Sequence, residues 1–209
     1  MSTPPRPDLA EVLLALDACQ QDEADAVSWA RPYGGDWERA LVECRHRDWL
    51  FWLAGRLLQR GHLRAEVLVT TACACARHVL HLVPANEERP RIAVEFAERW
   101  VRGRATWKEV SAARKGADFA AATVLRGPAA TVRYGFNDAA RAAAAAAWAA
   151  EVLPAAALAA DAARAAAARA AWATNGGGSG VTDRVKRELG PALIVGLEAY
   201  AATLPGASR

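Results

Sequence analysis

The sequence contains no long apolar run, no leader pattern and few cysteines. No segment approaches the ~20 apolar residues of a membrane-spanning helix, so we expect no membrane association. The stretch from Met1 to Asp8 is rich in proline and lacks a basic region followed by an apolar one, which is the pattern of a signal peptide. With four cysteines in 209 residues, we expect a cytoplasmic protein whose thiols are free.

The short motifs of common enzymes are also absent. The sequence has no G-x-S-x-G nucleophile motif, no H-E-x-x-H zinc motif and no kinase signature. The glycines from Gly176 to Gly180 precede a predicted helix, but they lack the Lys-Ser/Thr pair of a phosphate-binding loop and follow no strand. We interpret residues 174–180 as a flexible connector, and we expect neither a cofactor nor an enzymatic activity.

Neither sign of charge predominates, since the formal net charge is only +3. A dedicated nucleic-acid-binding protein usually has a clustered basic face. The nearest basic cluster contains Arg99 and Arg102, but Glu95 and Glu98 precede these arginines by four residues each, which is the spacing of ion pairs on a helix surface. We therefore expect a solvated face there and no nucleic-acid partner.

Alanine is the residue in excess, and it predicts an all-α fold. Between residues 139 and 173, 24 of 35 residues are alanine, the best helix former. Alanine buries little area, so Trp148, Leu158 and Trp172 are predicted to anchor these helices. We expect a bundle of nine to ten helices with the Ala-rich C-terminal helices packed on a Trp-rich N-terminal part. A single domain would cover 8–203, with its Trp-rich part at 8–126 and its Ala-rich part at 137–203; residues 1–7 would be disordered and 204–209 frayed.

Capping residues and helix breakers give the expected boundaries. Thr106 with Glu109 has the spacing of a capping box, and Asp8, Asp36 and Asp48 are predicted N-caps. One long helix is expected over 63–82. Further helices are expected over 183–189 and 191–203, with Pro191 beginning the second. Only residues 130–136 have some strand character, and a loop is an equal alternative there.

Cysteine and histidine residues form the strongest candidate for a metal-binding or catalytic site. Zinc prefers thiolate and imidazole ligands at short sequence spacing. The candidate ligands are Cys75, His78 and His81, three residues apart on one predicted helix, with Cys73, Cys44 and His46 as further members. No C-x-x-C pair is present, and alanine, valine and leucine surround these residues, so packing of the thiols in the core is favoured over a metal site. A cysteine nucleophile is a third interpretation, but no local motif marks one.

Tryptophan and charged residues supply the candidates for a partner-binding surface. Trp49, Trp52, Trp100 and Trp107 follow helical spacing among leucine and alanine, which favours burial over a stacking surface. Two groups, made up of charged residues and one tryptophan, remain as candidates for contact with a partner. They are Arg104, Trp107 and Lys108 in the first group and Asp22, Glu23 and Asp25 in the second.

Two stretches of the sequence carry a resemblance to a known family. They are Gly35-Asp36-Trp37 through Glu43-Cys44 into Asp48-Trp49-Leu50-Phe51-Trp52-Leu53-Ala54, and Arg89-Pro90-Arg91-Ile92-Ala93-Val94-Glu95 followed by Trp100-Val101-Arg102-Gly103, Thr106 and Val110. With the segment Cys73-Ala74-Cys75-Ala76 between them, residues 8–125 resemble the helical immunity-protein family of bacterial polymorphic-toxin systems. Residues 182–203 differ from the ending expected for that family.

The resemblance implies an all-α protein that binds another protein, such as a toxin, and it supplies no catalytic residues. An alternative function is a structural or adaptor subunit that self-associates through its Ala-rich helices. A metal- or thiol-dependent enzyme centred on Cys75, His78 and His81 is the third hypothesis.

Overall fold

The computed structural model describes residues 6–17, 21–124, 130–152, 156–174 and 178–204, and these residues form ten α-helices and no strand. The α-helices are α1 (Leu9–Ala15), α2 (Gln21–Ala30), α3 (Trp37–Glu43), α4 (Arg47–Gln59), α5 (Ala65–Val79), α6 (Arg89–Val101), α7 (Trp107–Val124), α8 (Ala130–Glu151), α9 (Ala156–Ala173) and α10 (Gly178–Ala201). Short 3₁₀ helices, η1 (Arg31–Tyr33) and η2 (Leu80–Leu82), follow α2 and α5. The predicted all-α fold is confirmed.

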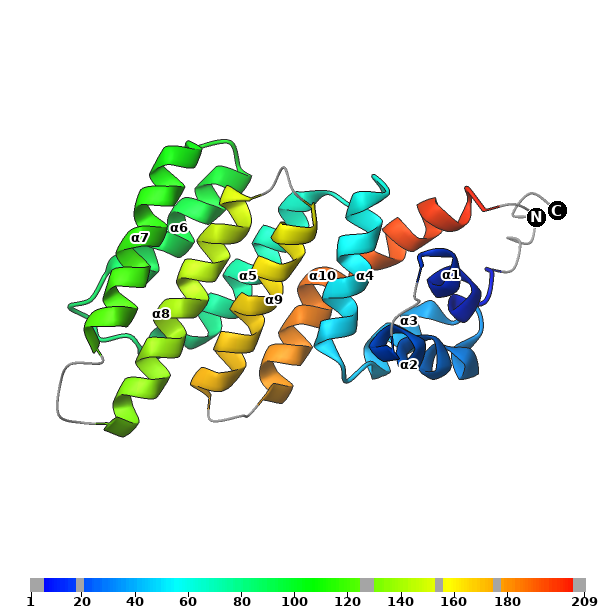
Figure 1. Ribbon diagram of the computed structural model, residues 1–209, viewed down its shortest axis with the longest axis horizontal. Helices are drawn as coiled ribbons and strands as arrows, with labels where there is room; N and C mark the ends of the chain where they lie inside the picture. The colour runs from blue at the N-terminus through cyan, green and yellow to red at the C-terminus, as the bar shows by residue number, and fades with distance from the viewer. Residues whose placement is uncertain (1–5, 18–20, 125–129, 153–155, 175–177, 205–209) are drawn as a thin grey trace.

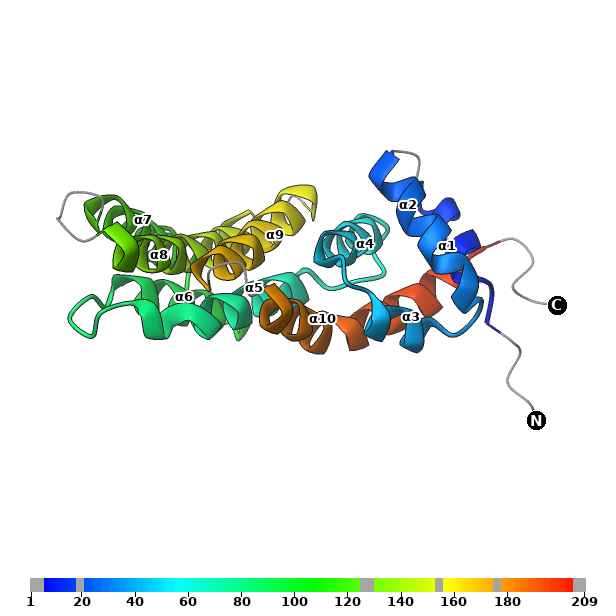
Figure 2. The same cartoon turned by 90° about the horizontal axis from the view of Figure 1, so that it is seen from below.

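Seven of the helices form two stacked layers. One layer has the order α7, α8, α9 and α4, and the other has the order α6, α5 and α10, as Figure 2 shows from the side. Helices α1, α2 and α3 lie at one end of this elongated array, next to the C-terminal part of α10 (Figure 1). Helix α10 therefore contacts both α5 in the array and α3 at its end.

Alanine makes close packing at the centre of the array feasible. Ala143, Ala147, Ala163 and Ala167 of α8 and α9 are fully buried. A Cβ atom at Gly55 of α4 would lie 3.1 Å from the Cβ of Ala160, so these two helices meet with almost no side chain between them. Small residues at such contacts let helix axes approach within the lower part of the usual 8–10 Å range. The Ala-rich helices thus lie inside the array and contact helices from both parts of the sequence.

The predicted caps are confirmed at three of the four helix starts. The side chain of Asp8 accepts a hydrogen bond from Ala10 N, and that of Asp36 accepts one from Arg39 N. Thr106 and Glu109 form the reciprocal capping box before α7, since the Glu109 carboxylate accepts from Thr106 N and Thr106 Oγ1 accepts from Glu109 N. Asp48 is not a cap, because α4 begins earlier and Asp48 lies in its first turn.

Three predicted segments differ from the structure. Residues 130–136 begin α8, so their few branched and aromatic residues do not make a strand. The expected long helix over 63–82 consists of α5 and the 3₁₀ turn η2. The two helices expected after residue 182 are one helix, α10, with Pro191 inside it, and the residues Gly178 to Gly180 of the predicted flexible connector belong to its first turn. Residues 175–177 of that connector lie outside the described part.

Two of the three predicted anchors are exposed to solvent. Leu158 is 46% exposed and Trp172 is 68% exposed, whereas Trp148 is half-buried against the core. Trp107 is also exposed, so its expected burial is wrong, while Trp49, Trp52 and Trp100 pack partly against the core. The anchors are unnecessary because the alanines of α8 and α9 are themselves buried, and each of these helices packs against four others. Among the described helices, none is both long enough and apolar enough to cross a membrane.

Candidate partner-binding site

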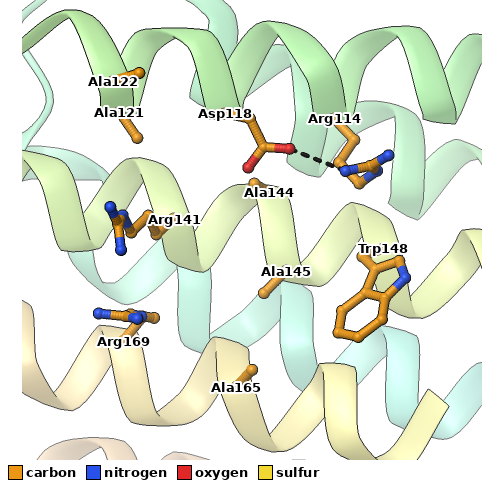
Figure 3. A pocket seen from close by; sticks show the side chains of 10 residues that line it. All are labelled: Arg114, Asp118, Ala121, Ala122, Arg141, Ala144, Ala145, Trp148, Ala165 and Arg169. Carbon is orange, nitrogen blue, oxygen red and sulfur yellow. Dashed lines mark hydrogen bonds and ion pairs between the residues drawn. The ribbon is translucent and has the colours of Figure 1, made fainter. Parts of the chain in front are cut away.

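An open trough of about 370 Å³ runs along the outer face of α8 (Figure 3). Arg141, Ala144, Ala145 and Trp148 lie on this face, since residues at positions i, i+3, i+4 and i+7 share one side of a helix. The trough exists because alanine side chains are too short to fill the space between the two helices that flank α8.

Helices α7 and α9 supply the walls of the trough. Arg114 and Asp118 come from α7, and Ala165 and Arg169 come from α9. Both helices pack against α8, which places their side chains on either side of its exposed face. Three helices that follow one another in the chain thus build one surface.

The three arginines of the trough differ in how they are paired. Arg114 Nε donates to Glu151 Oε2 at 2.7 Å, and its Nη1 donates to Asp118 Oδ2 at 2.9 Å. Arg169 Nη1 lies 3.1 Å from Asp138 Oδ1. Arg141 has no hydrogen bond or ion pair within the described part of the chain.

Arg141 and Arg169 lie at the same end of the trough and come from adjacent helices (Figure 3). Because Arg141 is exposed and has no partner among the described residues, and Arg169 has one ion pair, this end carries a net positive charge. Guanidinium groups offer planar, paired N–H donors that match the two oxygens of a carboxylate. The arrangement is therefore suited to an anionic group brought by another molecule.

Trp148 occupies the opposite end of the trough, beside Arg114. Its ring is half-buried and packs against the core, so it is held in place and still presents part of its surface. A fixed aromatic ring of this kind can contact an apolar side chain with little loss of conformational entropy. The trough thus combines a cationic end, an alanine floor and an apolar end.

The cysteine and histidine candidates do not come together in a metal site. Among the described residues, no group of three or more histidine, cysteine, aspartate or glutamate side chains is placed so that it could hold a metal ion. Cys44, Cys73 and Cys75 are buried free thiols, while His81 Nδ1 lies 3.0 Å from the carbonyl oxygen of His78. Cys19 lies outside the described residues.

Burial also makes these cysteines poor nucleophiles. It raises the pKa of the Cys75 thiol to about 12, and it raises the pKa of Cys73 and of Cys44 as well. The thiolate is the reactive form, so at neutral pH these residues behave as small apolar side chains. Partial burial, with Arg184 and His81 nearby, lowers the pKa of His78, which is then mostly neutral at pH 7.

The partner-binding candidates singled out in the sequence are not among the residues that line the trough. Trp107 and Lys108 are exposed at the start of α7, and Arg104 is exposed just before it. Asp25 is exposed on α2, at the other end of the array from α7. Asp22 and Glu23 belong to the same helix, but their side chains lie outside what the structure describes. The structure therefore does not bring the two groups together.

Sequence reasoning missed Arg141, Arg169 and Trp148 as members of one site. The spacing of Arg141 and Trp148 on one helix face was a usable signal within the alanine run. Arg169 belongs to another helix, so its position beside Arg141 depends on how α8 and α9 pack. No pattern within a single helix contains that information.

A second hollow, of about 520 Å³, lies near the aromatic residues Trp29 and Tyr33. Three of its polar side chains are engaged within the protein, whereas Arg45 and the ring of His46 have no hydrogen bond or ion pair among the described residues. Tyr33 donates its hydroxyl hydrogen bond to Glu43 at 2.9 Å, Arg39 also binds Glu43, and Lys186 Nζ donates to the carbonyl oxygen of Val42 at 2.7 Å. This hollow therefore offers a partner one cation, Arg45, whereas the trough places two arginines, Arg141 and Arg169, at one end.

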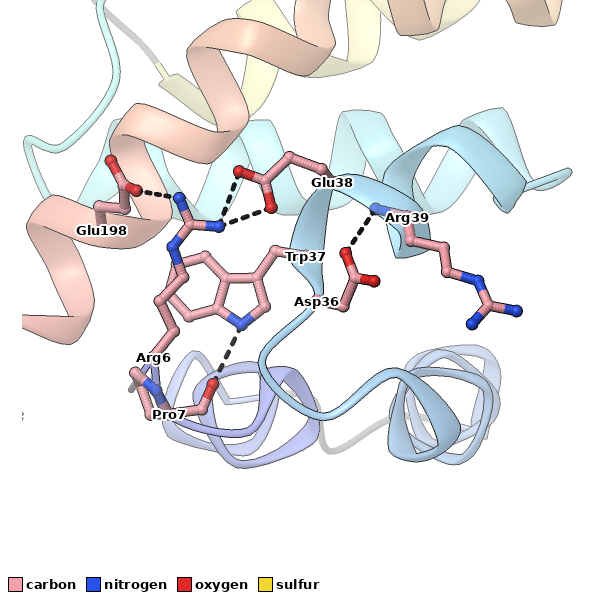
Figure 4. A network of polar contacts seen from close by, with 7 residues as sticks. All are labelled: Arg6, Pro7, Asp36, Trp37, Glu38, Arg39 and Glu198. Atoms are coloured by element: carbon pink, nitrogen blue, oxygen red, sulfur yellow. Dashed lines mark hydrogen bonds and ion pairs between the residues drawn. The ribbon is translucent and has the colours of Figure 1, made fainter. Parts of the chain in front are cut away.

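A polar network at the far end of the array has a structural role (Figure 4). Arg6 binds Glu38 of α3 and Glu198 of α10, and its guanidinium lies 5.4 Å from the ring centre of Trp37. The indole N–H of the buried Trp37 donates to the carbonyl oxygen of Pro7 at 3.0 Å. These contacts fix the segment before α1 against two helices and leave no group turned toward a ligand in this cluster.

Neither a known family model, nor a curated protein, nor a solved structure matches the chain. The resemblance to immunity proteins in residues 8–125 therefore remains a prediction from the sequence.

Proposed function

We propose that the chain is a non-enzymatic protein-binding domain that receives its partner in the trough of α7, α8 and α9. The observation that carries this proposal is the exposed guanidinium of Arg141, which has no partner in the described part of the chain and lies beside Arg169 above a floor of alanine. Arginine and tryptophan are enriched among the residues that dominate binding energy at protein interfaces, and lysine is depleted there. All three cations of the trough are arginine, and Trp148 lies at its other end.

A protein partner suits the trough better than a nucleic acid. Asp118 is part of the lining, and Glu151 and Asp138 pair with two of the three arginines. A nucleic acid carries a phosphate at every nucleotide, and these carboxylates would repel it. A protein surface can instead place a single carboxylate at Arg141 and uncharged groups along the rest of the trough.

We further propose that the partner is a toxin and that binding neutralises it. This finer proposal is supported by the resemblance of residues 8–125 to the immunity-protein family. Co-expression with the product of a neighbouring toxin gene tests it, because the chain should restore growth to cells that make the toxin. Undiminished toxicity in the presence of abundant folded chain would refute this assignment.

A charge-reversal pair tests the protein-binding proposal itself. We expect Arg141→Glu to remove a specific protein from those that co-purify with the wild-type chain in its native host. Arg187→Glu is the matched control, because Arg187 is exposed on α10, in the other layer. This substitution changes the net charge by the same amount. Quantitative mass spectrometry of both samples should show loss with the first variant alone. Identical sets of proteins from the wild type and Arg141→Glu would overturn the proposal.

A further inference from the structure

We infer that the trough binds an amphipathic helix of the partner, which carries a carboxylate for Arg141 and Arg169 and an apolar side chain for Trp148. This inference rests on the proposed function and adds the chemistry and spacing of the bound segment. Each part of it follows from a different feature of the trough.

The cationic end selects a carboxylate. Arg141 is unpaired within the described residues, and Arg169 uses Nη1 to contact Asp138, so both guanidinium groups retain free N–H donors. Hydrogen bonds between charged partners are about twice as strong as those between neutral groups. An aspartate or glutamate side chain is the group on a protein that supplies this charge.

The alanine floor selects a helix. Ala144 and Ala145 leave the backbone of α8 covered only by methyl groups, and Ala165 continues this low surface onto α9. Small residues on one helix allow another helix to approach closely and to place its own side chains into the space. The trough follows the axis of α8 between α7 and α9, so a helix lying along it contacts all three.

The two ends of the trough set the spacing in the bound helix. Arg141 and Trp148 are seven residues apart on α8, which corresponds to ~10.5 Å along the axis at 1.5 Å per residue. On a helix lying along the trough, two side chains this far apart are seven residues apart and lie on the same face. The partner therefore needs an acidic residue and an apolar residue at positions i and i+7, in either order.

Designed peptides test this inference without the natural partner. Two Ala/Gln-based peptides of about 18 residues, long enough to form helix in water, each carry one Glu and one Leu seven positions apart, in opposite order. Binding to the isotope-labelled chain is followed by NMR through the indole N–H of Trp148 and the Nε–H groups of Arg141 and Arg169. We expect at least one peptide to shift these three signals and to leave the signals of residues outside the trough largely unchanged.

Matched controls identify the interactions responsible. Replacement of the peptide Glu by Gln should weaken binding about tenfold, which corresponds to about 1.4 kcal/mol, because the neutral amide cannot form a charge-assisted hydrogen bond. Arg141→Gln should have the same effect on the Glu peptide, and Arg187→Gln should have none. Equal binding of the Glu and Gln peptides would overturn the inference, as would shifts located away from the trough.

The failures of the inference and of the proposed function are distinguishable. If neither peptide binds but Arg141→Glu still loses its protein partner, the trough binds a protein by another geometry and only the helix inference is wrong. If a single-stranded RNA of similar length shifts the same signals and the peptides do not, the partner is a nucleic acid and both proposals are wrong.

Discussion

Gly116 and Gly196 both lie inside helices, but the space around them differs sharply. A Cβ at Gly116 would lie 3.7 Å from Arg89, an ordinary contact, whereas a Cβ at Gly196 would lie 2.8 Å from the backbone oxygen of His62 and 3.1 Å from Leu57 Cδ1. We expect Gly116→Ala to stabilise the protein by about 0.5–1 kcal/mol through helix propensity. Gly196→Ala should destabilise it by about 1–3 kcal/mol through overpacking.

Thermal unfolding measures both glycine variants, with a shift of about 2–4 °C per kcal/mol for a chain of this size. The two substitutions add the same methyl group to a helical glycine, so each is the control for the other. A rise in Tm with Gly196→Ala would contradict the close approach of α10 to the loop that contains His62.

Cys75 is expected to resist alkylation in the folded protein. Burial raises its pKa to about 12, so very little thiolate is present at pH 8. Iodoacetamide followed by peptide mapping should leave Cys75 unmodified in buffer and modified in denaturant. Rapid labelling in buffer would show that the α5 region opens far more often than its packing indicates.

Through its ion pair with Glu38, Arg6 makes the stability of the folded protein depend on pH. Its hydrogen bond to Glu38 is the main cause of a pKa below the ordinary value for that carboxyl. The unfolded chain then binds the proton more tightly, so the stabilisation is present above the ordinary pKa and is lost as the pH falls through the folded one. We expect the Tm of Arg6→Gln to fall less than that of the wild type between about pH 5 and 3.

The control for this acid dependence is Arg187→Gln, which removes a cation that contacts no carboxylate within the described residues. Its Tm should follow the wild-type pH profile. Parallel profiles for Arg6→Gln and the wild type would mean that the pair with Glu38 contributes nothing measurable, as many surface pairs do.

Helix α10 shows where reasoning at the level of the element succeeds and where it fails. The sequence correctly predicted helix on both sides of Pro191, but it placed a boundary there because proline lacks the N–H of a helical residue. The structure keeps one helix through Pro191, and its two parts pack against α5 and α3. Tertiary contacts offset the lost hydrogen bond, and local propensity contains no information about them.

For helices α8 and α9, the sequence predicted the secondary structure but not the position in the fold. Their alanine content predicted helix with the correct extent over most of residues 139–173. It did not predict their position inside the array, because alanine has no patterned apolar face that distinguishes the buried side from the exposed one. The trough was therefore missed, although its members Arg141 and Trp148 share one helix face. Capping boxes, by contrast, are local, and the one at Thr106 and Glu109 was predicted correctly.

Tyr200 joins α10 to the end of α1. Its hydroxyl donates to the carbonyl oxygen of Ala15 at 2.6 Å and accepts from Arg60 Nη1 at 3.2 Å. Tyr200→Phe leaves the Ala15 oxygen without this donor, which should cost about 1 kcal/mol. We expect faster amide hydrogen exchange in α1 and unchanged exchange in α8. Tyr33→Phe, which removes an exposed hydroxyl contact to Glu43, is the control and should alter neither helix.

At the scale of the whole molecule, the array is held together by many small contacts and few large side chains. Apolar residues from Leu9 to Ala201 belong to one continuous core cluster, which passes through both layers. The surface that we propose for a partner lies over α7, α8 and α9, and the Arg6 network lies at the opposite end, around α3 and α10. Variants at Arg6 and at Arg141 should therefore affect stability and binding separately.

The alanine-built interior also sets how the protein responds to temperature. An alanine side chain exposes little apolar surface when the chain unfolds, and the heat capacity of unfolding rises mainly with that surface. We expect a heat-capacity change below the usual ~12–15 cal/mol/K per residue, which calorimetry can measure. A small heat-capacity change flattens the curve of free energy against temperature, so this protein should lose little stability on cooling toward 0 °C.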